Sequence, residues 1–144
     1  MNYLVNSRYG SLLYQTNEVI ELSMSSSTFV KQLCHAHLFT LSGYLQACQQ
    51  TFGYRYKIPL YLSKRLALFP TKNWREIDTV WINQKNVRSF KAKGRQTELT
   101  FFNQEKLIID LSYGKVQEQI QRLETIEKYK VNIFIHPMIE KHFK

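Results

Sequence analysis

Eleven lysine and arginine side chains fall between residues 54 and 95, against only two carboxylates, Glu76 and Asp78. Ammonium and guanidinium groups neutralise phosphates and release the counterions that condense on a polyanion. Residues 1–53 and 96–144 each net to zero, so 11 − 2 = +9 accounts for the whole formal charge. Solubility alone would be served by scattered charges of both signs. The clustering favours a nucleic-acid surface, and the candidate DNA-binding residues are Arg55, Lys57, Lys64, Arg65, Lys72, Arg75, Lys85, Arg88, Lys91, Lys93 and Arg95.

A second group of residues has side chains that can bind zinc or act as a Cys–His nucleophilic pair: Cys34, His35, His37 and Cys48. Structural zinc sites usually carry paired ligands at short spacing, and no second pair follows here. A cysteine near a histidine in an apolar helix is usually inert. Paired carboxylates and glycine-rich loops are also missing from the sequence. We therefore expect no catalytic residue, metal ligand or cofactor, and no enzyme.

The N-terminal part predicts short strands at residues 3–5, 12–14 and 19–22, with a turn around Gly10. The serines at 25–27 can cap a helix. Its inner face would carry Phe29, Val30, Leu33, Cys34 and His37 or Leu38. A second helix is expected from Ser42 to Gly53, with Tyr44, Leu45 and Cys48 facing inward.

From residue 54 the pattern changes. Residues 54–63 look extended because Pro59 fixes the backbone, and residues 66–69 form a short apolar run. Strands are predicted at 79–82, 87–92, 97–102 and 107–111, with turns at 93–95 and 103–106. A helix capped by Ser112 follows, with an inner stripe of Val116, Ile120, Leu123 and Ile126. Residues 131–135 read as a strand or an extended docking segment, and residues 138–144 as a frayed helix.

Together these elements predict an α+β fold in a single domain of residues 1–144. Short strands and helices come first, followed by an antiparallel β-meander that an amphipathic helix closes. On the strand at 87–92, Lys91 and Lys93 share one face, whereas Arg88 faces the other way. The turn Lys93-Gly94-Arg95 would project beyond the sheet, so the expected surface combines an extended 55–65 arm with a basic hairpin. Hairpins of this kind can follow a phosphate backbone or enter a groove.

The N-terminal residues, the hydropathy and the two cysteines indicate the cellular compartment of the protein. The first ten residues lack the apolar region of a secretory signal, and no run approaches the roughly 18 apolar residues of a membrane span. Two reduced, buried thiols in a cytoplasmic protein without membrane association are the simplest expectation.

Several short motifs resemble the ComK family of competence transcription factors in their order and spacing. They are Cys34 with Gly43 and Gly53, Lys57-Ile58-Pro59, Leu68-Phe69-Pro70-Thr71, Trp81-Ile82, Val87 with Phe90-Lys91, Thr100-Phe101 with Asn103, and Ser112-Tyr113. The resemblance covers about residues 27–128, with a fainter similarity at the N-terminus. Residues 79–127 also resemble, more loosely, a LytTR-type DNA-binding domain.

The ComK resemblance implies an activator that binds AT-rich promoter boxes of double-stranded DNA, largely through the minor groove, as a homodimer or higher homo-oligomer. It also implies contact with RNA polymerase and with a Clp protease adaptor. Narrow, strongly negative A-tract grooves attract Arg and Lys. Two departures stand out: the family carries basic residues where Tyr44 and Leu45 follow Gly43, and its chains run further beyond Phe134.

Two other functions stay open. The departure after Gly43 suggests a protein-interaction module, such as an anti-activator, that keeps the fold but has lost DNA contacts. The aromatics Tyr54, Tyr56, Tyr61 and Trp74 interleave with the cations, and stacking on them would suit single-stranded nucleic acid.

Overall fold

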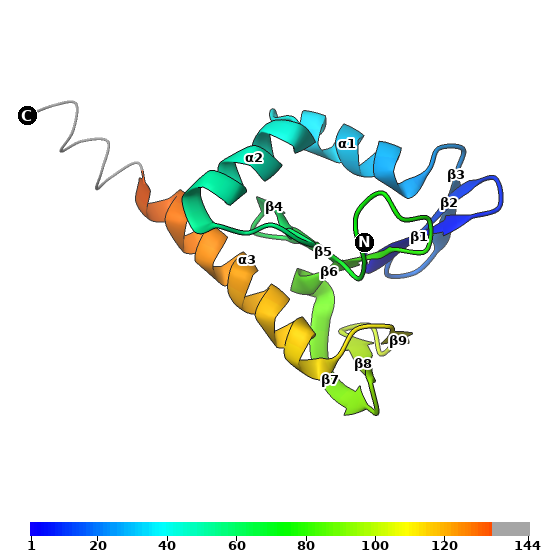
Figure 1. Ribbon diagram of the computed structural model, residues 1–144. Coiled ribbons are helices and arrows are strands. Elements are labelled where there is room, and N and C mark those ends of the chain that lie inside the picture. Colours follow the sequence, from blue (N-terminus) through cyan, green and yellow to red (C-terminus); the bar gives the residue numbers. More distant parts are fainter. Residues whose placement is uncertain (134–144) are drawn as a thin grey trace, which may run out of the picture.

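The computed structural model describes residues 1–133. Within these residues it shows two antiparallel sheets and three α-helices (Figure 1). The larger sheet has the strand order β3-β2-β1-β6-β5-β4, and the smaller one β7-β8-β9. The larger sheet comprises β1 (Tyr3–Ser7), β2 (Gly10–Tyr14), β3 (Val19–Leu22), β4 (Leu60–Ser63), β5 (Leu66–Pro70) and β6 (Val80–Asn83). The smaller comprises β7 (Val87–Lys93), β8 (Gln96–Phe101) and β9 (Lys106–Ile109). The helices are α1 (Ser26–Ala36), α2 (Leu41–Phe52), the 3-10 turn η1 (Gln84–Asn86) and α3 (Tyr113–Ile133).

The larger sheet is buried on both faces, because its strands alternate between two hydrophobic clusters. Leu4 and Trp81, opposite each other on β1 and β6, lie with Val30 and Cys34 of α1 in one cluster. Their neighbours Tyr3 and Ile82 lie in the other cluster, with residues of α3 and the smaller sheet. The sheet therefore forms the middle layer, with α1 and α2 on one side of it and α3 and the smaller sheet on the other (Figure 1).

Local capping explains where the first two helices begin and end. The Ser25 hydroxyl accepts a hydrogen bond from the backbone N–H of Thr28, and Gly53 ends α2 with φ 74°. The second helix begins one residue earlier than Ser42, because the Thr40 hydroxyl accepts from the N–H of Gly43 and caps it. The inner stripes are confirmed, except that the side chain of Leu38 is exposed.

The expected α+β fold and its C-terminal meander are confirmed, with one change of partner. The strand near residues 79–82 leaves the meander: β6 pairs with β1 and β5 of the larger sheet. Only β7, β8 and β9 form the meander that precedes α3. In α3 the Ser112 hydroxyl accepts from the N–H of Lys115, and Val116, Leu123 and Ile126 are buried.

Two local predictions were wrong. Residues 54–59 are an irregular loop that bends at Lys57 (φ 49°), because its carbonyls at Tyr56 and Lys57 are held by Arg122 and Gln119 of α3. Residues 131–133 continue α3 as helix, since no proline or glycine interrupts the chain there. The rest of the expected 131–135 segment and the helix at 138–144 lie outside the described residues.

Asparagine side chains join the two sheets at the N-terminal strand. The Asn2 amide donates to Asn103 Oδ1 and Glu105 Oε1, each at 3.2 Å, and accepts from Asn86 at 3.0 Å. Asn103 and Glu105 lie in and beside the β8–β9 turn, and Asn86 lies just before β7. This network therefore fixes the smaller sheet against β1. Asn83 of β6 joins it, because the Met1 carbonyl accepts from both Asn83 and Asn86. We call the network the asparagine junction: Asn2, Asn83, Asn86, Asn103 and Glu105.

Aromatic stacking continues the same connection into the core. The Tyr3 ring stacks on Tyr14 at a centroid distance of 4.2 Å and on Phe101 of β8 at 5.8 Å. Phe101 is fully buried and belongs to the smaller sheet, so the stack spans both sheets. Offset aromatic pairs of this kind add about 0.5–1.5 kcal/mol beyond the area they bury.

Asn83→Ala should destabilise the fold strongly. The Asn83 side chain accepts from the N–H of Ala67 and donates to the carbonyls of Met1 and Arg65, while itself only 1% exposed. Removing it leaves these groups without their partner, each at a cost of about 1–3 kcal/mol. We expect urea unfolding to show a loss of about 3 kcal/mol with an unchanged m-value.

The matched control is Asn132→Ala on the exposed surface of α3, which should change the free energy of unfolding by less than about 0.5 kcal/mol. A loss below about 1 kcal/mol for Asn83→Ala would show that the network contributes little to the fold.

Candidate nucleic-acid interface

The outer face of the smaller sheet gathers lysines from two strands. Lys91 of β7 pairs with Glu98 of β8, and Lys106 of β9 pairs with Thr100. Directly opposed residues share one face of a sheet, and Lys93 is two residues from Lys91. The alternate residues of these strands, among them Phe90 and Leu99, pack into the core. We call the exposed side the basic sheet face: Ser89, Lys91, Lys93, Gln96, Glu98, Thr100 and Lys106.

Glu98 lies at the centre of this face. Its carboxylate is 3.4 Å from the Lys91 ammonium, 3.5 Å from Lys93 and 3.9 Å from Lys106. Partial desolvation would raise the pKa of Glu98, but Lys93, Lys91 and Lys106 outweigh it and hold this pKa below its usual value. The carboxylate is thus ionised at neutral pH, and three ammonium groups share one negative charge. The face keeps a surplus of positive charge.

The turn between β7 and β8 extends the positive surface. Gly94 takes φ 62° as the first central residue of a two-residue hairpin turn, and a side chain there would be strained. The next residue, Arg95, is exposed and has no carboxylate within ion-pair distance in the part of the chain that the structure describes. The guanidinium at this tip is therefore free to contact a phosphate or enter a groove.

Three other predicted cations have partners within the protein. Lys85 lies 2.9 Å from the Glu127 carboxylate of α3, and its side chain is 26% exposed. Lys72 pairs with Asp78 and lies 3.9 Å from Asp110. Arg88 sits at a β-bulge and donates to Gln104 at 3.2 Å. These interactions connect loops to the rest of the fold.

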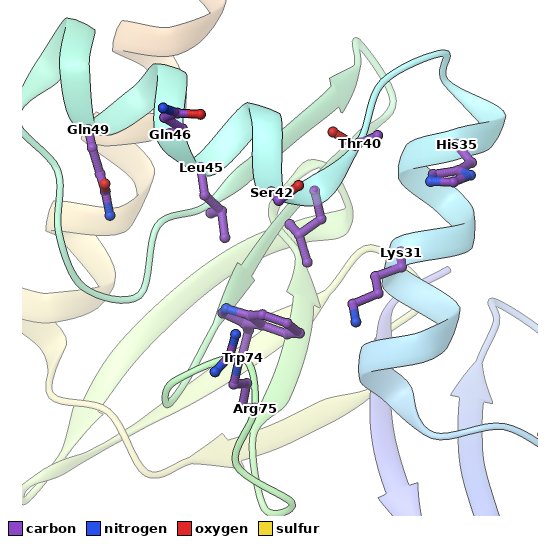
Figure 2. Close-up of a pocket in the computed structure, with 10 residues that line it drawn as sticks. Lys31, His35, Thr40, Ser42, Leu45, Gln46, Gln49, Trp74 and Arg75 are labelled. Atoms are coloured by element: carbon purple, nitrogen blue, oxygen red, sulfur yellow. The ribbon is translucent and has the colours of Figure 1, made fainter.

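The remaining predicted cations are exposed but belong to other elements. Arg55 and Lys57 lie in the loop after α2, and Lys64 and Arg65 form the β4–β5 turn. Arg75 lies in the β5–β6 loop and lines the same groove as Lys31 of α1, with Trp74 between them (Figure 2). Only Lys91, Lys93 and Arg95 of the eleven lie on the basic sheet face or its tip, so the block divides into several surfaces.

Lys106 is a candidate interface residue that lies outside the eleven predicted cations. It falls in the neutral C-terminal third, where the sequence predicts a turn at residues 103–106. One feature of the sequence indicates its position, because Lys106 directly precedes the apolar residues 107–109 and can begin the same strand. The structure shows Lys106 as the first residue of β9, which pairs with β8.

The aromatics that interleave with the cations are mostly occupied. Tyr61 is 8% exposed, and Tyr54 stacks on Phe52 while the Arg122 guanidinium covers it at 4.6 Å. Trp74 is half-buried between two cations. Of the four, only Tyr56 presents an open ring, at 76% exposure. This arrangement does not provide the row of stacking platforms that single-stranded binding uses.

The cysteines and their neighbours form a core and not a reactive centre. Cys34 and Cys48 are free and buried. Burial raises the pKa of the Cys34 thiol to about 11 and also raises that of Cys48, so both are protonated at neutral pH. The Tyr44 hydroxyl donates to the Pro59 carbonyl and accepts from the N–H of Tyr61, which explains why this residue faces inward.

Within residues 1–133, no group of three or more His, Cys, Asp or Glu side chains is arranged to hold a metal ion. Over the same residues, none of the helices combines the length and the apolar character needed to cross a bilayer.

Comparison with known proteins identifies one family. The family model described as ComK protein matches residues 2–133. Comparisons with curated proteins and with solved structures give no match. The matched range contains both sheets and all three α-helices of the described chain. The protein therefore belongs to the ComK family of competence-related transcription factors.

Proposed function

We propose that this protein binds double-stranded DNA through the basic sheet face and the Arg95 tip, and activates transcription from AT-rich promoter sites in the cytoplasm. The observation that carries the proposal is the convergence of Lys91, Lys93 and Lys106 on one exposed sheet face. Membership of a transcription-factor family supports DNA as the polyanion.

The geometry of the hairpin suits a groove. A two-stranded β-ribbon fits the major groove of B-DNA, and strand-based proteins also bind the minor groove. A-tracts narrow the minor groove and deepen its negative potential, which attracts an inserted arginine. Arg95 projects at the turn for such insertion, while the lysines behind it would lie along the flanking phosphates. Arg95 would therefore provide the preference for AT-rich sites. The lysines of the basic sheet face would provide most of the affinity for DNA.

The ComK resemblance further supports a homodimer or higher homo-oligomer on DNA, contact with RNA polymerase, and control by a Clp protease adaptor. A symmetric dimer would place two basic hairpins on successive half-sites, so that the phosphate contacts of each protomer add.

Replacing Lys91, Lys93 and Arg95 together by alanine should weaken duplex binding by at least about tenfold. The remaining affinity would come from phosphate contacts made by cations on other parts of the protein. Each lost phosphate contact lowers the slope of log K against log salt by about 0.9, so the triple variant should lose up to about 2.7 in slope. Fluorescence anisotropy with an AT-rich duplex across a salt series measures both quantities.

The control removes three cations from other elements: Arg8, Lys115 and Lys128, all exposed, are replaced by alanine. It should change the slope far less than the first variant. Equal losses for both triples would leave only a general attraction between a basic protein and DNA. Wild-type affinity that is the same for AT-rich and GC-rich duplexes would remove sequence preference.

The protein-interaction alternative has one supporting observation, since Tyr44, at a position where the family carries a basic residue, is part of the core here. If that alternative holds, the Lys91/Lys93/Arg95 triple variant will stay folded and keep its effect on promoter activity. Loss of promoter activity in the folded variant excludes it.

Glu98→Gln should strengthen DNA binding. The carboxylate opposes the phosphate charge and neutralises part of Lys91, Lys93 and Lys106. Without it the face gains one net positive charge, equivalent to about one more phosphate contact, and the salt slope should steepen by about 0.9. The gain should be similar for AT-rich and GC-rich duplexes, because phosphate contacts carry no sequence information.

Glu124→Gln on the exposed side of α3 makes the same change of charge at another site. If both variants raise affinity equally, net charge and not the basic sheet face accounts for binding.

A further inference from the structure

A second surface feature lies on the opposite side of the larger sheet from the smaller one. A groove of about 550 Å³ runs between α1, α2 and the β5–β6 loop (Figure 2). Among residues 1–133, no aspartate or glutamate lines it, whereas Lys31 and Arg75 both do. None of its lining residues belongs to β7, β8 or β9, so it is separate from the basic sheet face.

Trp74 organises the two cations of this groove. The Lys31 ammonium lies 5.2 Å from the centroid of the Trp74 ring, and the Arg75 guanidinium lies 5.0 Å from it. Both distances fall within the range of cation–π attraction. The two side chains come from different elements, α1 and the β5–β6 loop, and the indole between them attracts both before any ligand arrives. An anionic partner would then lose less side-chain entropy on binding.

The rest of the groove suits a peptide better than a nucleic acid. Leu41 and Leu45 of α2 supply an apolar part of its lining, and Gln46 and Gln49 supply amides that can donate to and accept from a peptide backbone. Its volume lies in the range of sites that enclose a few side chains. A DNA duplex needs a longer row of cations than the two found here.

An exposed leucine strengthens this assignment. Leu38 lies in the turn between His35 and Thr40, which both line the groove. Its side chain is 93% exposed, and its φ of 69° belongs to the Schellman turn that ends α1, where the N–H of Leu38 donates to the His35 carbonyl and the N–H of Phe39 to the Cys34 carbonyl. The phosphate groups of DNA provide no apolar surface for this leucine, whereas an apolar side chain of a protein partner would bury it.

We propose that this groove docks an acidic segment of a protein partner in which carboxylates alternate with apolar side chains. The carboxylates meet Lys31 and Arg75, and the apolar side chains meet Leu45 in the groove and Leu38 in the turn beside it. An activator bound to DNA through the basic sheet face would present this groove away from the DNA. The groove can therefore recruit a second protein while the first surface stays bound.

The two tryptophans make the test specific. The Trp74 indole N–H reports on the groove, and the Trp81 indole, 1% exposed in the core beneath α1 and α2, is an internal control. The full chain, labelled with ¹⁵N, is titrated with three probes: a short amidated peptide alternating glutamate with leucine and phenylalanine, the same peptide with glutamine for every glutamate, and a short AT-rich duplex.

We expect the acidic peptide to shift the Trp74 signal with a Kd below about 1 mM and to leave the Trp81 signal in place. The glutamine peptide should bind at least about tenfold more weakly, since charge complementarity is lost. The duplex should shift the backbone signals of Lys91 and Lys93 and leave Trp74 unchanged. The duplex and peptide responses are read separately, so failure of the proposed function and failure of the groove are distinguishable.

Variants locate the contact. Lys31→Glu with Arg75→Glu should weaken the acidic peptide by at least about tenfold, while Lys115→Glu with Lys128→Glu, two exposed cations of α3, should change its Kd less than about twofold. Leu38→Ser, which tests the apolar anchor without touching charge, should weaken it about threefold or more.

Three results would overturn the proposal. The Trp74 signal could stay unmoved by the acidic peptide up to about 1 mM in the folded protein. The glutamine peptide could bind equally well, which would exclude recognition of carboxylates. The duplex could shift Trp74 as strongly as the peptide does, which would assign the groove to nucleic acid.

Discussion

A set of partly buried side-chain hydrogen bonds, centred on the buried amide of Asn2, connects the two sheets of this protein. The Asn2 side chain, 2% exposed, contacts Asn86 before β7 and both Asn103 and Glu105 around the β8–β9 turn. Buried amides are costly unless each donor and acceptor is satisfied, so the arrangement tolerates little displacement. The smaller sheet consequently has one orientation relative to β1. Every property of its outer face follows from that orientation.

The orientation determines which cations become available to a partner. One face of the meander packs against α3 and the larger sheet through Phe90, Leu99 and Phe101, so the alternate residues must point outward. Lys91, Lys93 and Lys106 then gather on the outward side, each within 3.9 Å of the Glu98 carboxylate. Lys72 lies 3.9 Å from Asp110, which follows β9, and Lys85 lies 2.9 Å from Glu127 of α3, so each connects its own segment to another part of the fold. Position in the fold, and not position in the charge block, decides the role of each cation.

Local signals in the sequence were sufficient for most elements. Alternation between residues 87 and 101, with Gly94 at the turn, predicted the β7–β8 hairpin and the shared face of Lys91 and Lys93. The stripe containing Val116 and Leu123 predicted α3. These patterns depend only on neighbours in the chain, which is why they could be read without tertiary information.

Non-local contacts were not predictable in the same way. Tyr3 of β1 pairs with Ile82 of β6, although the two residues are far apart in the sequence. Because of this pairing, the strand predicted at residues 79–82 belongs to the larger sheet and not to the meander. The Lys85–Glu127 ion pair and the contribution of Lys106 depend likewise on which elements become neighbours. Within the expected 55–65 arm, residues 60–63 form β4, but contacts with Gln119 and Arg122 of α3 hold the residues before Leu60 in a loop. The composition of the sequence showed which segment carries the net charge. The tertiary structure distributes the cations of that segment over several separate surfaces.

Lysine footprinting tests the central claim most directly. The protein is acetylated briefly with and without an AT-rich duplex, and the modification of each lysine is measured by mass spectrometry. The account predicts strong protection of Lys91, Lys93 and Lys106, with Lys57, Lys64, Lys115 and Lys128 acetylated at the same rate in both samples. Protection centred on Lys57 and Lys64, with the three lysines of the basic sheet face still reactive, would contradict it.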